Sequence, residues 1–130
     1  MARQAVVFIL TFAAMLGCGV SLVAHHSGSA AYFETKSQII EGRLVQFIYR
    51  NPHSFVHVDV PGPDGTLTRW VVEWTSGQAL SGMGVTRETL KAGDMVVVTG
   101  APGRNDDEHR LLMRAIVRPK DGWKWTGITR

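Results

Sequence analysis

The chain has 130 residues, 45% of them hydrophobic, and its 14 Lys and Arg against 11 Asp and Glu give a formal net charge of +3. This length suffices for one small domain, and so mild a charge does not indicate a nucleic acid or another polyanion as partner. The only cysteine, Cys18, allows no intrachain disulfide, so a hydrophobic core must stabilise the fold.

The N-terminal residues predict a secretory signal peptide. Arg3 supplies a short positive region, residues 6–17 are apolar, and small residues lead up to Ala24. We expect residues 1–24 to be removed after Ala24, leaving a periplasmic protein with 13 basic and 11 acidic residues, a net charge of +2. Two alternatives stay open. A retained leader is long enough to cross a membrane, and residues 15–18 form a poor lipoprotein box.

Residues 25–38 predict an N-terminal arm. Ser27-Gly28-Ser29 is a flexible opening, and no periodicity is sustained before residue 38. Tyr32 and Phe33 are the side chains that we expect to hold this arm on the domain.

Residues 39–118 contain short apolar runs separated by turn signals, which is typical of an all-β domain. We predict five strands, at residues 39–49, 53–60, 66–74, 95–100 and 111–118. A short helix near residues 78–80 and another helical turn at residues 86–90 are expected between the third and fourth strands. This order predicts a small five-stranded barrel of the oligonucleotide- and oligosaccharide-binding (OB) type, with an open sandwich as the alternative. Residues 119–130 are expected to form a C-terminal tail.

Two features refine this barrel. In the second strand, alternation places Val56, Val58 and Val60 on one face, the better candidate for the core, with His53 and His57 on the other. Gly42 is expected to mark a bulge or bend in the long first strand.

Three short motifs occur in order along the chain: His25-His26-Ser27, Asn51-Pro52-His53 and the stretch TRETLKAGD at residues 86–94. Together they resemble the small exported bacterial proteins of the domain-of-unknown-function 6152 family, over residues 25–118. The chain departs from that pattern at Gly28, where an aromatic residue is expected, and at Ala92, where proline is expected. The resemblance implies an exported, periplasmic protein with a small β-barrel, and it brings no established activity.

The five histidines all follow the leader: His25, His26, His53, His57 and His109. After cleavage, the free amine and imidazole of His25 would chelate one ion, and nitrogen ligands suit Cu(II), Ni(II) or Zn(II). His53 and His57 are about 13 Å apart along a strand, too far to bind one ion together. We therefore predict a copper or zinc site formed by His25 and His53, with His26 and His57 assisting. The alternative is that the N-terminal histidines are solvated and that His57 is a surface residue facing Asp59 or a cross-strand carboxylate such as Glu73.

The tryptophans form a second set of candidates. Trp70 and Trp74 share a face of the third strand with Val72 and could form a ligand groove that stacks sugar rings or bases. Packing in the core is the more common role for such residues, and Trp123 and Trp125 could cover an open end of the barrel.

Enzyme chemistry has little support in the sequence. No nucleophile elbow, phosphate-binding glycine loop or metalloprotease helix is present, and a triad drawn from Ser27 or Ser54 with Asp59 or Glu73 uses only common residues. We expect an exported binding or accessory protein of the bacterial envelope, whose partner is an envelope protein or a small ligand and not a nucleic acid. A metal-independent module that binds a partner or glycan is one alternative, and a metal-dependent enzyme is another.

Overall fold

The computed structural model describes residues 30–127 of the chain. The predicted signal peptide and the histidines at positions 25 and 26 lie outside the described residues, so cleavage after Ala24 and metal binding by the N-terminus stay predictions. None of the helices within residues 30–127 has the length and apolar character needed to span a membrane.

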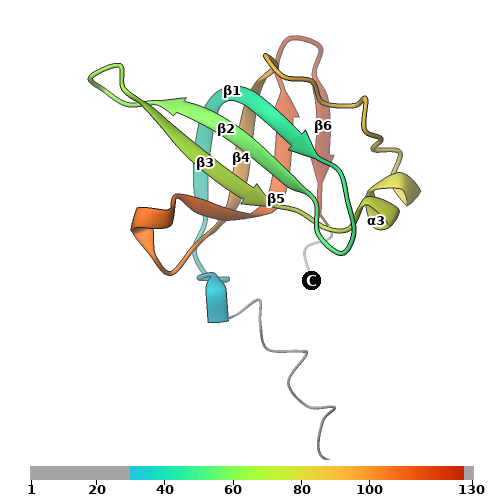
Figure 1. Ribbon diagram of the computed structural model, residues 1–130, viewed down its shortest axis with the longest axis horizontal. Coiled ribbons are helices and arrows are strands. Elements are labelled where there is room, and N and C mark those ends of the chain that lie inside the picture. The colour runs from blue at the N-terminus through green and yellow to red at the C-terminus, as the bar shows by residue number, and fades with distance from the viewer. Residues whose placement is uncertain (1–29, 128–130) are drawn as a thin grey trace, which may run out of the picture. The chain divides into compact units, whose positions relative to one another are not determined.

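The fold is built from six strands: β1 (Gln38–Ile48), β2 (Phe55–Pro61), β3 (Leu67–Glu73), β4 (Met95–Pro102), β5 (Arg110–Arg118) and β6 (Trp123–Thr126). A short helix, α3 (Gly77–Gly82), connects β3 to β4, and a 3-10 turn, η1 (Asp106–Glu108), lies between β4 and β5 (Figure 1). The strands form one sheet in the order β3-β2-β1-β4-β5-β6.

The first five strands close into a barrel. Neighbouring strands in the sheet are antiparallel, and β3 then pairs with β5 in parallel through Val71–Arg110, Val72–Leu111 and Glu73–Leu112. We call these three pairs the closing seam. They confirm the expected all-β, OB-like barrel with a short helix between its third and fourth strands, in place of an open sandwich.

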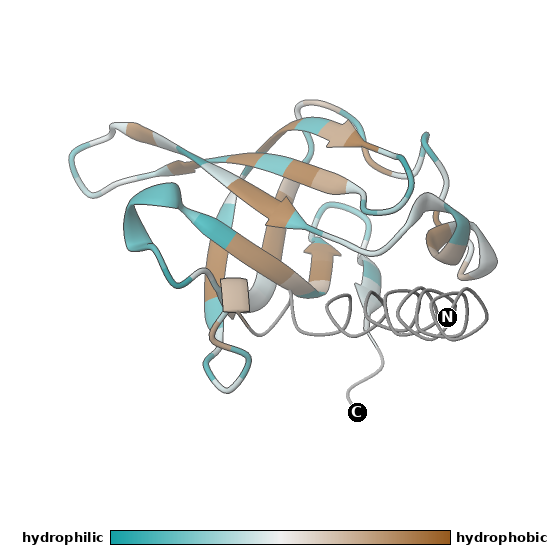
Figure 2. Ribbon diagram, turned by 60° about the horizontal axis from the view of Figure 1, so that its bottom comes forward, coloured by the Kyte–Doolittle hydropathy of each residue, from teal (hydrophilic) through white to brown (hydrophobic). Residues whose placement is uncertain are grey.

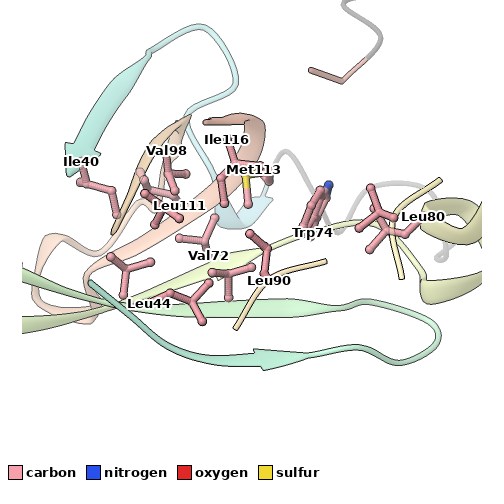
Figure 3. Close-up of a cluster of buried hydrophobic side chains, with 14 residues drawn as sticks. Ile40, Leu44, Val72, Trp74, Leu80, Leu90, Val98, Leu111, Met113 and Ile116 are labelled. Carbon is pink, nitrogen blue, oxygen red and sulfur yellow. The ribbon is translucent and has the colours of Figure 1, made fainter. Parts of the chain in front are cut away.

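The core lies inside this barrel. Apolar residues, brown in Figure 2, alternate along the strands with hydrophilic residues, drawn in teal, because successive side chains of a strand point to opposite faces. Val56 and Val58 are fully buried, as the alternation predicts, and Val60 packs against the core from a partly exposed position. Trp74 is 2% exposed and lies on the side of the cluster toward Leu80 of α3 (Figure 3).

The bend in β1 lies three residues beyond the predicted position. The register between β1 and β2 shifts between Leu44 and Gln46, so Val45 is the extra residue of a bulge. Gly42 has a different role, because a Cβ atom there would lie 2.2 Å from the carbonyl oxygen of Asp59. The glycine therefore allows β2 to approach β1 closely.

At residues 86–90, where a helical turn is predicted, the chain forms a single hydrogen-bonded turn, in which the Thr89 N–H donates to the Thr86 carbonyl at 3.1 Å. The Thr86 N–H donates to Thr89 Oγ1 at 2.8 Å, and the Glu88 N–H donates to Thr86 Oγ1 at 3.3 Å. The threonine side chains thus accept from N–H groups at the start of the turn, as capping side chains do at a helix N-terminus. The predicted short helix near residues 78–80 is present as α3, where Ser76 Oγ caps the first turn by accepting from the Ala79 N–H.

A sixth strand occupies part of the predicted tail. The chain turns back at Gly122, whose φ of 73° suits glycine, and Trp123–Thr126 pairs with residues 115–118 of β5. Trp123 and Trp125 are half-buried against the core.

Asp94 is a buried carboxylate that joins the turn before β4 to the end of β5. It is 7% exposed and accepts hydrogen bonds from Arg118 Nη1 at 3.0 Å and Lys120 Nζ at 3.1 Å. Burial by itself raises the pKa of Asp94, but a bond from the Lys91 N–H and those from the two side chains together hold the pKa below its ordinary value of 3.8. The charged carboxylate is therefore part of the folded state.

Replacing Asp94 by alanine is expected to lower the free energy of unfolding by about 2–3 kcal/mol, because a buried acceptor is lost and the Arg118 guanidinium loses one of its two carboxylate partners. Urea denaturation measures the change. Asp107→Ala, which makes the same charge change at an exposed residue, is expected to alter stability by less than about 0.5 kcal/mol. Equal stabilities of the two variants would contradict this account of Asp94.

Candidate functional site

A cavity of about 430 Å³ opens beside the end of β3. Its wall includes His53, Glu73, Trp74, Met83, Met113 and Trp125. We call it the seam cavity, because Glu73 belongs to the closing seam and Met113 follows the last seam residue of β5. It combines one imidazole, one carboxylate, two thioethers and two indole rings.

Glu73 is the centre of the polar contacts at this cavity. Its side chain is 14% exposed, and its Oε1 contacts Nδ1 of His53. Oε2 accepts a hydrogen bond of 2.6 Å from the Tyr32 hydroxyl and lies 3.5 Å from Nη2 of Arg110. One carboxylate therefore interacts with the arm, with the residues before β2 and with the first residue of β5.

Tyr32 holds the arm on the barrel, as expected. Its side chain is 2% exposed, and the residue forms a bridge with Gly103. The Phe33 N–H donates to the Pro102 carbonyl at 2.8 Å, and the Arg104 N–H donates to the Ala31 carbonyl at 3.0 Å. Burial, and then the neighbouring Glu73, raise the pKa of the Tyr32 hydroxyl well above its ordinary value, so the hydroxyl remains the donor.

His53 lies just before β2 with its side chain 56% exposed. Its backbone carbonyl accepts from Arg50 Nε at 3.3 Å. Since Nδ1 faces the Glu73 carboxylate, the neutral ring carries its proton on Nδ1 and presents the lone pair of Nε2. A carboxylate that fixes an imidazole in this way is a common support for histidine ligands of metals.

His57 is not among the residues that line the seam cavity. It lies on the outward face of β2, opposite Val71, and is partly buried. Burial, and then the charge of Arg69, lower the pKa of His57 below its ordinary value of 6.5. Glu73, considered as a partner for His57, contacts His53 instead. Within residues 30–127, no three side chains of His, Cys, Asp or Glu gather closely enough to hold a metal ion.

The two candidate groove tryptophans border separate cavities. Trp74 lines the seam cavity, and its ring meets that of Trp125 edge-on, with centroids 4.9 Å apart. Trp70 is half-buried and stacks on the ring of His109 at 5.3 Å, beside a second cavity of about 230 Å³. Ligand binding by either tryptophan stays a prediction.

Two indole groups at the seam cavity have no hydrogen-bond partner among the described residues. They are Nε1 of Trp74 and Nε1 of Trp125, and both atoms are buried. A buried donor without an acceptor costs free energy, so these two indole groups are an energetic cost of the fold.

Sequence reasoning missed the methionines of the site. Met83 follows α3 and Met113 lies on the inward face of β5, where alternation with Leu111 indicates only a core residue. Their shared cavity with His53 depends on closure of the barrel, for which the sequence gives no local signal.

The model of a family of unknown function, DUF6152, matches residues 14–112 of the chain. No curated protein matches the chain. Among solved structures, two crystal structures of the mitochondrial single-stranded DNA binding protein Rim1 from S. cerevisiae, one of them selenomethionine-labelled, align with TM-scores of 0.47 at 17% and 16% identity. Each alignment covers 62% of this chain and 90% or 91% of Rim1. DNA binding is a property of Rim1 and is not transferred here.

The lowered pKa of His57 predicts that the fold loses stability as the pH falls below about 6.5. The unfolded chain takes up a proton there that the folded chain resists, so the free energy of unfolding rises with pH in this window. His57→Gln, which has no such proton, is expected to flatten the change in urea midpoint between about pH 5 and about pH 7.5. Gln46→Ala, at the residue opposite His57 on β1, is the control and keeps the slope. Equal slopes for wild type and His57→Gln would refute the role of His57.

Proposed function

The chain belongs to the DUF6152 family, whose function is unknown, and we propose from the seam cavity that it is a small binding protein of the bacterial envelope that binds a copper-like ion through His53. The observation that carries this proposal is the His53–Glu73 pair at the wall of the cavity. Export with cleavage after Ala24 is part of the proposal.

The support for His53 comes from how firmly its orientation is set. Glu73 holds Nδ1, and Glu73 is in turn held by Tyr32 and Arg110. The Nε2 atom is then a neutral nitrogen ligand that needs little reorganisation before it binds an ion. Imidazole nitrogen suits copper and zinc, and copper binds such ligands more tightly.

His25 supplies the further nitrogen ligands, through its amine and its imidazole. Tyr32, seven positions along the chain, reaches Glu73 with its hydroxyl, and Glu73 contacts His53. Seven residues span up to about 23 Å when extended, so His25 is within reach of His53. In this proposal His26 and His57 assist from outside the ligand set.

Copper binding is tested on protein that a bacterial host has exported and processed, with intact mass recorded to fix the N-terminus. In Cu(II) titrations, His53→Ala and a blocked variant, in which the N-terminal amine of processed protein is acetylated, are each expected to bind at least about tenfold more weakly. Glu73→Gln is expected to weaken binding by about tenfold by loosening the imidazole. Zn(II) is titrated in parallel.

His109→Ala is the matched control, because His109 stacks on Trp70 away from the seam cavity. Its Cu(II) affinity is expected to equal that of the wild type. Binding no tighter than that of a histidine-containing peptide, or equal affinities for the wild type, His53→Ala and the blocked variant, would exclude the proposed function.

A metal-independent binding module is the second candidate. It is favoured by Trp74 and Trp125, which line the seam cavity and whose indole N–H groups lack an acceptor within residues 30–127; an oxygen-rich ligand such as a glycan would supply one when a ring turns toward the cavity. A neutral trisaccharide such as maltotriose, added in the presence of EDTA, is then expected to change the tryptophan fluorescence. Trp125→Phe is expected to abolish the change, whereas Trp123→Phe, outside the cavity wall, keeps it. No change at millimolar sugar would count against this candidate.

A further inference from the structure

Two methionines border the same cavity as His53. Met113, on β5, is 7% exposed, and Met83, just after α3, is 44% exposed. A thioether is a soft ligand that selects Cu(I) over the harder divalent ions. Met95, the third methionine within residues 30–127, lies on β4 at 42% exposure and does not line the cavity.

The closing seam places Met113 at this cavity. Glu73 pairs with Leu112 across the seam, so the next residue on each strand, Trp74 and Met113, reaches the cavity wall. Met83, the residue that follows α3, also lines the cavity wall. Because methionine is unbranched and has three rotatable bonds, each sulfur can adjust its position toward an ion.

The side chains that line the cavity do not repel a cation. None of the described lining residues is Lys or Arg, and the Glu73 carboxylate on the wall offsets the nearby Arg110 guanidinium, 3.5 Å away. The aromatic rings of Trp74 and Trp125 border the same space, and aromatic faces attract cations while excluding water.

We propose that the seam cavity is a Cu(I) site whose ligands are Nε2 of His53 and the thioethers of Met83 and Met113. This inference rests on the proposed function, since both use His53. It adds a second oxidation state of copper, which is bound by a different set of ligands. In addition to His53, Cu(II) takes the nitrogen ligands of the N-terminus, whereas Cu(I) takes the sulfur ligands of the barrel. Thioethers cannot form disulfides, so such a site persists in an oxidising compartment where cysteine ligands would be lost.

The test is a Cu(I) competition titration of the exported and processed protein against the chelator bicinchoninate, without oxygen and with ascorbate. Met83→Leu and Met113→Leu are each expected to bind Cu(I) at least about tenfold more weakly. Their Cu(II) affinities are expected to stay within about twofold of the wild type, since no thioether takes part there. Leucine nearly conserves the volume of methionine, and circular dichroism confirms that each variant folds.

Met95→Leu is the matched control and is expected to bind Cu(I) as the wild type does. Wild-type Cu(I) affinity in the Met83→Leu, Met113→Leu double variant overturns the Cu(I) site. If Cu(II) binding still requires His53 in that case, the proposed function stands without it. Should Met113→Leu fail to fold, X-ray absorption of the Cu(I)-loaded wild type decides: sulfur neighbours support the site, and a shell of nitrogen and oxygen alone overturns it.

Discussion

The parallel pairing of β3 with β5 is the constraint on which the rest of the structure depends. Only three residue pairs make it, but they turn a sheet into a barrel and bring together segments that the chain separates by about 40 residues. The pairing sets Glu73 level with Leu112, and the cavity with its ligand candidates follows from that register. Site and fold are therefore not separable in this protein, because the same ladder forms both.

Glu73 is the residue in which the site and the fold share the same contacts. Its carboxylate is mostly buried and interacts with the Tyr32 hydroxyl, the His53 imidazole and the Arg110 guanidinium. A buried carboxylate needs such partners, since an unpaired one would be strongly disfavoured. Glu73 anchors the arm through Tyr32 and orients the His53 imidazole through its own Oε1. The position of the arm and the orientation of the His53 ring therefore depend on one side chain.

The periodicity of apolar residues in the sequence predicted which face of a strand is buried. Alternation in β2 identified Val56 and Val58 as core residues, and the order of strands and helix led to the OB-like barrel. β6 was missed because four residues are too few to show a period. The cavity was missed for another reason: alternation says which face a residue occupies but not which distant strand it meets. The contact between Tyr32 and Glu73, 41 positions apart, has no local signature at all.

β5 divides its pairing between two strands on the same side. Its first three residues pair with β3 and its residues 115–118 pair with β6, which leaves residues 67–70 of β3 and the outer side of β6 as unpaired edges at the two ends of the sheet order. Each of these edges is four residues long, and each carries an exposed cation, Arg69 on one and Lys124 on the other. Short, charged edges are poor templates for a strand from another molecule. The pairing that closes the barrel therefore also shortens the edge of β3 to which another molecule could add a strand.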